Sequence, residues 1–415
     1  MMDKILNVYL NAECVGELSQ DQAGNLTFKY DDAYFASASR GISLSLPLQE
    51  HTHQGPHVDA FFSGLLPDES VRDRLAAFLG VSKANAFALL EIVGGDCAGA
   101  IALYPRESTL LTQTHADYQV LDDKALIEAL DMIKRRPMLA GDDGYRLSLA
   151  GAQDKLAVRL LEGGDVAIMK NGAPSTHILK PMIERVIDSA HNELFCMRLA
   201  QNVGIDVPNV SLHHVGDRPY YLVERYDRTI NENGQIARIH QEDFCQALGI
   251  APTIKYQREG GPGIDQCLDV IRAHTARPAR DNLKFLDIVV FNFLIGNADA
   301  HGKNVSLLYT GNKPVLAPAY DLLSTAIYPD LADKMAMKIG GHYKPRDIYL
   351  LSFLKHVPDT KLAQNAMTKR IYAMSDKVLA EFPKLVDALK LENVNSDIFD
   401  DIYKVVKWRV ERLRT

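Results

Sequence analysis

The sequence is poor in cysteine, and its cysteines follow no pairing pattern. Among 415 residues there are only five, and no two of them form a C-x-x-C pair. They are Cys14, Cys97, Cys196, Cys245 and Cys267. A disulfide-stapled miniprotein needs dense and evenly numbered cysteines, so this class is excluded. The scatter is typical of reduced thiols, and we expect a cytoplasmic protein.

Long apolar runs are missing as well. The most apolar stretch, residues 288–296, is far shorter than the roughly 20 residues that cross a bilayer. The first residues alternate apolar and polar side chains, a strand pattern without the continuous apolar region of a secretion signal. We therefore expect neither a membrane span nor a cleaved signal.

A positive net charge is also absent. The chain has 53 acidic and 46 basic residues, which gives a formal net charge of −7. This balance argues against a protein that binds nucleic acid or anionic lipid over its whole surface. A local basic patch stays compatible with it, and the run KVVKWRVERLRT at 404–415 contains the only tryptophan, Trp408. Such a run is more often the solvated face of a terminal helix than a DNA contact.

What the sequence does have is enough apolar material for several cores. Hydrophobic residues make up 47% of it, and at roughly 100–200 residues per domain the length predicts two or three domains. Short strand patterns dominate the first half and long helical patterns the second. We expect an N-terminal unit over 1–105, a β-rich lobe over 106–226 and a helical lobe over 227–415, with a polar junction after residue 105.

Individual elements can be placed within these parts. Alternating runs at 6–10 and 26–30, with the turn sequence DQAGN between them, predict a hairpin. A helix that begins after Pro67 and ends at Gly80 would carry Val71, Leu75 and Phe78 on one face. Five strands and one helix are expected in the β-rich lobe, at 145–161, 166–170, 177–181, 208–215, 219–228 and 189–203.

A cluster of polar side chains follows an almost wholly apolar helix pattern at 285–295. Asp299, His301 and Asn304 lie within six residues, and Asp321 comes seventeen residues after Asn304. Phosphoryl transfer needs a carboxylate near the attacking hydroxyl and hard oxygen ligands for Mg²⁺. Asp299 fits the first role, and Asn304 with Asp321 the second. Alternatively these side chains satisfy backbone groups in a turn and a helix cap.

The β-rich lobe offers matching features for a nucleotide. Small residues in SLAGAQDKL, 148–156, would let backbone N–H groups approach a phosphate, although an ordinary hairpin turn also explains them. Lys180 ends an apolar strand and should point to water or to an anion. With Glu193 on the following helix it would form the pair that positions nucleotide phosphates in protein kinases. The hinge would be VERYDR, 223–228.

These motifs together resemble a known family. SLAGAQDKL, HILKP, VERYDR, NADAHGKNVSLL and PAYDLLST occur in the order and spacing of the HipA family. The segments LNAECVGEL, FFSGLLPDE and GGDCAGAI resemble the extra N-terminal unit of that family. Its members are atypical serine/threonine kinases that act as toxins of bacterial toxin–antitoxin pairs.

The resemblance implies a fold and a site. The fold would be α+β, a two-lobed protein-kinase-like fold with an extra N-terminal α/β subdomain. Asp299 would be the catalytic base, and Asn304 and Asp321 would bind Mg²⁺. ATP would be held by Ala150, Gly151, Ala152, Gln153, Asp154, Lys155, Lys180, Glu224 and Tyr226.

Further roles also follow from the resemblance. Ser148 matches the serine that HipA-like kinases autophosphorylate, Glu193 would pair with Lys180, and His301 would stabilise the catalytic loop. The expected partner is a dimeric HipB-like helix-turn-helix antitoxin, through which operator DNA would mainly be contacted. The expected substrate is a translation protein such as glutamyl-tRNA synthetase.

The sequence departs from ordinary protein kinases, because it has no G-x-G-x-x-G, H-R-D, D-F-G or A-P-E motif. Their rules of activation therefore do not transfer. Two alternatives to a protein kinase toxin stay open. One is a small-molecule or lipid kinase of the same fold, and the other is a non-catalytic nucleotide-binding co-repressor scaffold.

Overall fold

The computed structural model describes residues 4–106, 118–141, 146–170, 172–184, 186–232 and 235–415. Contacts divide the chain into two compact units. The first contains residues up to Pro181 with 214–254 and 306–314, and the second contains 182–213, 255–305 and 315–415. The expected junction at 107–117 lies outside the described residues, and the domain boundaries at 105 and 226 stay a prediction.

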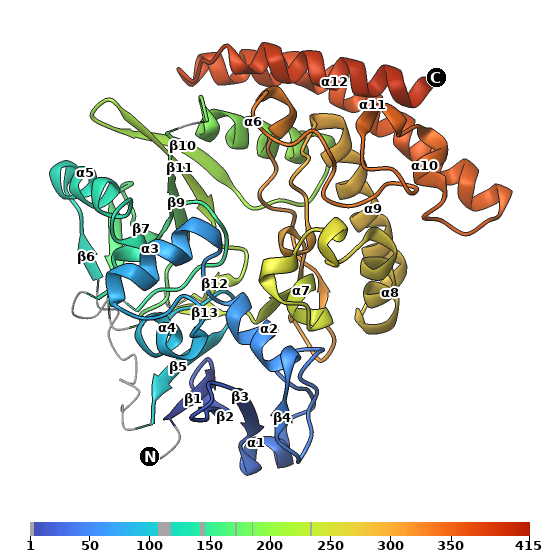
Figure 1. Ribbon diagram of the computed structural model, residues 1–415. Coiled ribbons are helices and arrows are strands. Elements are labelled where there is room, and N and C mark those ends of the chain that lie inside the picture. The colour runs from blue at the N-terminus through green and yellow to red at the C-terminus, as the bar shows by residue number, and fades with distance from the viewer. Residues whose placement is uncertain (1–3, 107–117, 142–145, 171, 185, 233–234) are drawn as a thin grey trace. The chain divides into compact units, whose positions relative to one another are not determined.

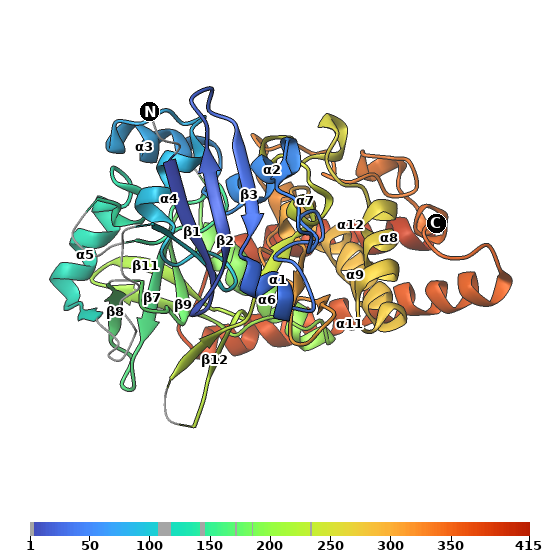
Figure 2. The same ribbon diagram turned by 90° about the horizontal axis from the view of Figure 1, so that it is seen from below.

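A five-stranded sheet opens the first unit, in the order β4-β3-β2-β1-β5. Its strands are β1 (Lys4–Leu10), β2 (Glu13–Gln20), β3 (Leu26–Tyr30), β4 (His53–Gln54) and β5 (Ile101–Pro105). Figure 2 shows β1, β2 and β3 side by side. The expected hairpin of 6–10 with 26–30 is wrong, because β2 lies between them. The sequence of β2 contains Gly16, so its alternation of apolar and polar residues is weak and the strand was missed. The pairing of β1 with β2 also has a register shift between Val8 and Tyr9.

Four helices accompany this sheet: α1 (Asp32–Ser37), α2 (Pro56–Gly64), α3 (Glu69–Leu79) and α4 (Ala86–Val93). The prediction for α3 is confirmed, since the helix ends at Gly80 in the left-handed conformation with φ 68°. Val71 and Leu75 are buried as expected. Phe78 is 47% exposed, which corrects its placement on the buried face, and the guanidinium of Arg136 lies over its ring.

A six-stranded sheet follows, in the order β10-β11-β9-β7-β8-β6. Its strands are β6 (Tyr118–Val120), β7 (Leu156–Leu160), β8 (Val166–Met169), β9 (His177–Pro181), β10 (Val210–Val215) and β11 (Arg218–Glu224), with α5 (Asp123–Met132) beside them in the chain. Five strands were expected. The missed strand, β6, is a three-residue edge strand whose side chains are all exposed, so it has no burial pattern to detect.

Short elements complete the first unit, where mainly helical patterns with few strands were expected after residue 227. They are β12 (Arg228–Ile230), β13 (Ile236–Arg238), β14 (Gln241–Asp243), α7 (Phe244–Leu248) and β15 (Ser306–Leu308). β12 pairs with β13, and β14 pairs antiparallel with β15. The helical pattern at 241–250 and the strand pattern at 305–309 are confirmed by α7 and β15. The strands β12, β13 and β14 were missed, because three residues are too short to show a period of two.

The second unit is mainly helical. Its helices are α6 (Ser189–Val203), α8 (Ile264–His274), α9 (Pro278–Ile295), α10 (Leu350–Leu354), α11 (Lys361–Leu391) and α12 (Ile398–Arg414), and it also contains β16 (Val315–Leu316). In Figure 1 the red helices α11 and α12 run alongside α6, and α12 also contacts α9. No helix within the described ranges is long and apolar enough to span a bilayer.

Two helix predictions are confirmed here. α6 has the expected bounds 189–203, and Cys196, Leu199 and Ala200 are buried on its inner face. α9 includes the expected apolar run, and every residue from Val290 to Ile295 is buried. The C-terminal helix α12 exposes Trp408 and buries Arg409.

Candidate active site

The loop after α9 is fixed by its own side chains. Gly296 ends the helix in the left-handed conformation with φ 76°. A Cβ there would lie 2.7 Å from Val405 Cγ1, so only glycine fits. Asn297 then bridges back, since its Nδ2 donates to Asn292 Oδ1 at 2.8 Å and its Oδ1 accepts from the Asp299 N–H at 3.1 Å. The position of the Asp299 backbone is therefore set by the end of a buried helix.

The structure brings Asn304 and Asp321 together, as the sequence predicted. Asn304 Nδ2 donates to Asp321 Oδ2 at 2.7 Å. The hydroxyl of Tyr320 donates to the Lys303 carbonyl at 2.6 Å, which joins the two segments a second time. Asp321 has φ 59°, an unfavourable conformation for this residue that clusters at functional sites.

This pair fits a hard divalent cation. Asn304 Oδ1 is buried and has no hydrogen-bond partner among the described residues, and the carboxylate of Asp321 lies next to the same amide. Amide and carboxylate oxygens are the ligands that Mg²⁺ prefers. Among the residues that the structure covers, no group of three or more His, Cys, Asp or Glu side chains forms an alternative metal site.

Asp299 has a partner that sequence reasoning missed. The hydroxyl of Tyr256 donates to Asp299 Oδ1 at 2.6 Å. The Tyr256 ring also meets the ring of His301 edge-on, with 5.2 Å between centroids. Tyr256 lies 43 residues before Asp299 in a segment without a motif, so no local signal pointed to it.

His301 stabilises the loop through its backbone. Its N–H donates to the Asp299 carbonyl at 2.8 Å, and its own carbonyl accepts from the Asn304 N–H at 2.9 Å. The side chain is 6% exposed. Burial and the neighbouring Lys255 lower the pKa of His301 to about 3, so the imidazole is neutral at physiological pH.

The segment expected to receive phosphates lies in the first unit and is not a hairpin turn. It precedes β7 as irregular backbone, with isolated bridges from Pro67 to Gly151 and from Asp96 to Leu147. Lys155 Nζ donates to the Ala150 carbonyl at 2.7 Å. Gly151 has φ 110°, and a Cβ there would lie 2.5 Å from Lys155 Nζ.

The other polar residues of this segment bond to the protein. Ser148 is fully buried, and its Oγ donates to the Leu65 carbonyl at 2.7 Å. Gln153 Nε2 donates to the Pro181 carbonyl at 3.2 Å. The carboxylate of Asp154 forms an ion pair with Arg74 at 2.6 Å. Ala152 is exposed and Ala150 is half-buried.

Lys180 lies on β9, opposite Tyr221 of β11. Lys180 is 6% exposed, with Nζ 5.8 Å from the centre of the Tyr221 ring, so of the two expected directions, water or an anion, the one toward water does not apply. The direction toward an anion stays a prediction. A buried strand lysine is kept inside by neighbouring π-electrons and polar groups. Glu193 is buried on α6 in the second unit. The ion pair between Lys180 and Glu193 stays a prediction.

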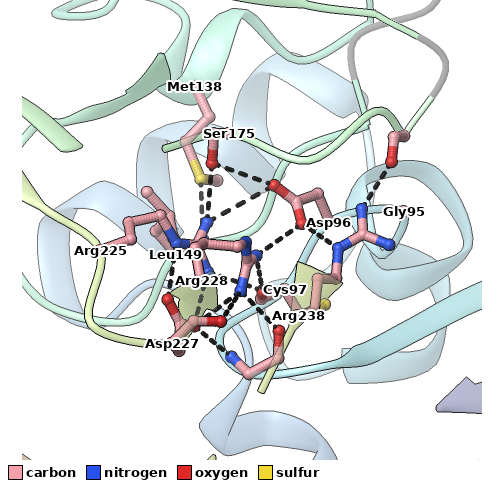
Figure 3. A network of polar contacts seen from close by, with 12 residues as sticks. Gly95, Asp96, Cys97, Met138, Leu149, Ser175, Arg225, Asp227, Arg228 and Arg238 are labelled. Carbon is pink, nitrogen blue, oxygen red and sulfur yellow. Dashed lines mark hydrogen bonds and ion pairs between the residues drawn. The ribbon is translucent and has the colours of Figure 1, made fainter. Parts of the chain in front are cut away.

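The expected hinge contains a buried ionic network, which sequence reasoning also missed. Glu224 ends β11 and is exposed, and the Tyr226 hydroxyl donates to Gln241 Oε1. Between them Arg225 binds both carboxylate oxygens of Asp227, at 3.0 and 2.9 Å. Figure 3 shows the charged side chains of the network, which come together from separate segments: Asp96, Arg225, Asp227, Arg228 and Arg238.

Asp96 is the second centre of this network. It accepts from Arg228 Nη2 at 2.8 Å and from Arg238 Nε at 3.0 Å. None of the five charged side chains is more than 7% exposed. Burial alone would raise the pKa of Asp96, but the surrounding arginines hold it below its usual range. The network therefore fixes the segment between Glu224 and Arg228 to residues 96–99.

Two protein-family models match most of the chain. Residues 6–104 match the model of the HipA N-terminal domain, and residues 147–384 match that of the HipA-like C-terminal domain. The Y4mE protein of Sinorhizobium fredii is 46% identical over 344 residues, which cover 82% of each chain. The serine/threonine-protein kinase toxin HipA of Shewanella oneidensis is 32% identical over 384 residues, covering 90% of this chain and 87% of the relative.

A solved structure agrees with the sequence relatives. It is the complex of Shewanella oneidensis HipA and HipB with operator DNA, which aligns with a TM-score of 0.84 at 29% identity over 99% of this chain and 97% of that one. The expected α+β kinase-like fold is thereby confirmed. By its two matching domains and its identity to a full-length relative, the chain belongs to the HipA family of serine/threonine-protein kinases.

Proposed function

We propose that this chain transfers the γ-phosphoryl group of ATP to a serine or threonine hydroxyl of a protein, as the toxin of a toxin–antitoxin pair in the cytoplasm. The observation that carries the proposal is the hydrogen bond between Asn304 and Asp321. Asn304 lies on the same loop as Asp299. A carboxylate for the hydroxyl and two oxygen donors for a cation are what this chemistry requires.

In the proposed mechanism the second unit performs the chemistry. Asp299 accepts the proton of the attacking hydroxyl while the Tyr256 hydroxyl and the Asn297 side chain hold its position. Asn304 and Asp321 would hold Mg²⁺, which would neutralise negative charge on the phosphates. His301 holds the loop together through its backbone hydrogen bonds with Asp299 and Asn304.

The first unit holds the nucleotide in this proposal. The backbone of Ala150, Gly151 and Ala152 approaches the phosphates, with Lys155 and Lys180 as the cations. Glu193, on α6, would pair with Lys180 in this proposal. Gln153 and Asp154 contribute through their backbone, because both side chains already bond to the protein.

The hinge completes the nucleotide site. Backbone groups of Glu224 and Tyr226 meet the adenine, supported by the ionic network on either side of them. Because Arg225 and Asp227 are buried and bonded to one another, the backbone between these residues is held rigid before ATP arrives.

We propose Ser148 as the autophosphorylation site. The serine is buried between the Leu65 carbonyl, which accepts from its Oγ, and the Asp96 carbonyl, which accepts from its N–H at 3.1 Å. A phosphate carries a charge of about −2 and needs donors, whereas these neighbours are acceptors. Phosphorylation would therefore require the segment to leave its place and would switch the kinase off.

The proposed partner is a dimeric HipB-like helix-turn-helix antitoxin. The chain would contact operator DNA mainly through this antitoxin, and the two proteins together would repress their operon. The named complex of the Shewanella relative supports this assembly. The net charge of −7 agrees with DNA binding through a partner rather than over the whole chain. The proposed substrate is a translation protein such as glutamyl-tRNA synthetase.

The decisive experiment incubates the full chain with Mg²⁺ and γ-labelled ATP. Wild type should label Ser148 and a protein substrate. Asp299→Asn should retain ATP binding but transfer 10²–10⁴-fold more slowly, about the contribution of a general base. Asp131→Asn, at an exposed ion pair with Arg218, is the matched control and should transfer normally.

Two results would contradict the proposal. Transfer by Asp299→Asn at the wild-type rate would remove Asp299 from the mechanism. ATP binding by wild type without transfer to any hydroxyl would favour the nucleotide-binding scaffold.

A further inference from the structure

Residues 65–74 of the N-terminal part contact the 148–155 segment at both of its ends and at its centre. The Leu65 carbonyl accepts from Ser148 Oγ at 2.7 Å. The Asp68 N–H donates to the Gly151 carbonyl at 3.1 Å, within a parallel bridge from Pro67. At the far end, Arg74 binds Asp154. The segment is therefore held along its length by α3 and the residues that precede it.

The contact of Arg74 with Asp154 is bidentate. Arg74 Nη2 lies 2.6 Å from Asp154 Oδ1 and Nη1 lies 3.2 Å from Oδ2. The same Nη1 donates to the Lys134 carbonyl, and Nε lies 3.3 Å from the Ser70 carbonyl. The side chains of Arg74 and Asp154 are 34% and 21% exposed. Two parallel bonds and partial burial distinguish this pair from an ordinary surface ion pair.

The helix that carries Arg74 is itself well fixed. Val71 and Leu75, on either side of Arg74, are buried in the core of the first unit. Gly80 ends the helix and its N–H donates to the last turn. Arg74 thus projects from a rigid element onto an irregular segment that contains Gly151 and two alanines.

We propose that Arg74 is a positioning residue that holds the phosphate-receiving segment in its ATP-binding conformation through Asp154. This rests on the proposed function, in which the backbone of 150–152 approaches the phosphates. It assigns a role in nucleotide binding to the N-terminal part of the chain, residues 6–104, which supplies the anchor from outside the nucleotide lobe.

Two physical effects support this role. A segment ordered before binding loses less conformational entropy when ATP arrives, so its affinity is higher. Arg74 also compensates the charge of Asp154, which would otherwise repel phosphates bound by the same segment. Both effects act on ATP affinity and leave the hydroxyl chemistry at Asp299 unchanged.

The test measures the dissociation constant of Mg·ATP by calorimetry, with kcat and KM for ATP, on the full chain. Arg74→Ala should raise the dissociation constant and KM about tenfold and leave kcat within about twofold. Arg74→Lys keeps the charge but not the bidentate geometry and should restore the affinity only in part. The double variant Arg74→Asp with Asp154→Arg exchanges the two charges. It should bind ATP more tightly than either single variant does.

The neighbouring arginine on the same helix provides the matched control. Arg72 Nε donates to the Lys83 carbonyl, and no described contact joins Arg72 to residues 148–155. Arg72→Ala should bind ATP like wild type. Thermal unfolding of each variant shows that the compared proteins are folded.

The outcomes separate this proposal from the one on which it rests. ATP binding by wild type and Arg74→Ala with equal affinity would overturn the role of Arg74, as would equal weakening by Arg72→Ala. If Arg74→Ala does not fold, the charge exchange decides, and failure to recover ATP affinity in a folded double variant overturns the proposal. Failure of wild type to bind ATP would instead contradict the proposed function.

Discussion

The catalytic carboxylate that we propose is held on one oxygen by a phenol. In the described structure the Tyr256 hydroxyl lies 2.6 Å from Asp299 Oδ1, within the range of a hydrogen bond to a charged acceptor. The backbone of Asp299 is fixed separately by Asn297. Tyr256 therefore sets the rotation of the carboxylate, while the loop sets its location.

Replacing Tyr256 by phenylalanine should lower kcat on the order of tenfold, because a hydrogen bond to a charged group contributes about 1.5–3 kcal/mol and the carboxylate would rotate more freely. ATP affinity should not change, since the first unit holds the nucleotide. Steady-state kinetics with a calorimetric titration of ATP would check both. Tyr372→Phe, on α11, is the control. An unchanged kcat, or a loss confined to ATP affinity, would show that Tyr256 does not position the base.

The sequence predicted which polar residues belong to the candidate site better than it predicted the residues to which they are hydrogen-bonded. Asn304 and Asp321 were grouped from spacing alone, and they meet. Tyr256, Arg74 and the bonds of Ser148 were not found, because each is a contact between segments 43 to 83 residues apart that no local pattern encodes.

The segment that links β11 to β12 is an element held by charge rather than by apolar packing. Arg225, Asp227 and Arg228 pack against Asp96, with Arg238 from β13 closing the group. The three guanidinium groups and two carboxylates have a net charge of +1 and are buried together. Removing one of them should destabilise the fold strongly, because the remaining charged groups would be buried without a partner and without water.

Asp96→Asn should lower the free energy of unfolding by about 3–5 kcal/mol, the usual effect of removing one member of a buried ionic group. Urea unfolding monitored by circular dichroism would measure it. The control is Asp131→Asn, whose exposed pair with Arg218 should contribute less than about 1 kcal/mol. Equal effects of the two changes would mean that the network is no more stabilising than a surface contact.

Elements with strong periodicity were predicted well, and those without it were not. The helix at 189–203 and the end of α3 at Gly80 followed from apolar spacing and a glycine. The short strands β6, β12, β13 and β14 did not, since their pairing partners rather than their own residues decide that they are strands.

The first unit also contains a buried carboxyl group that links distant parts of the chain. Glu242 on β14 accepts from Ser43 Oγ at 2.5 Å, from the Leu44 N–H at 3.1 Å and from the Tyr309 hydroxyl. Burial raises the pKa of Glu242 from 4.5 to about 7. The fold therefore favours the protonated form of this group.

The raised pKa of Glu242 makes the free energy of unfolding fall as the pH rises. Because the folded pKa is raised, the contribution of Glu242 to stability is complete below pH 4.5 and is lost as the pH rises to about 7. The loss is about 3 kcal/mol in the free energy of unfolding. The nearby His240, whose pKa burial lowers to about 3, acts oppositely as the pH falls below 6.5. Only a difference between variants isolates Glu242.

Glu242→Gln mimics the protonated form and should gain about 3 kcal/mol of stability relative to wild type between pH 4.5 and pH 8. Unfolding by urea at several pH values would measure the difference. Glu128→Gln, at an exposed position of α5, is the control for the same chemical change. A constant difference for Glu242→Gln would contradict the raised pKa.

The ionic network also has a consequence for the order in which the chain folds during its synthesis. Asp96 lies 142 residues before Arg238 and 129 before Arg225. A ribosome that adds about 5–20 residues per second needs roughly 6 to 26 seconds to make the shorter interval, from Asp96 to Arg225. Until then Asp96 has none of the guanidinium partners that it contacts in the folded protein, and an ionised carboxylate cannot be buried without them. Final packing around residue 96 must therefore wait for a much later part of the nascent chain.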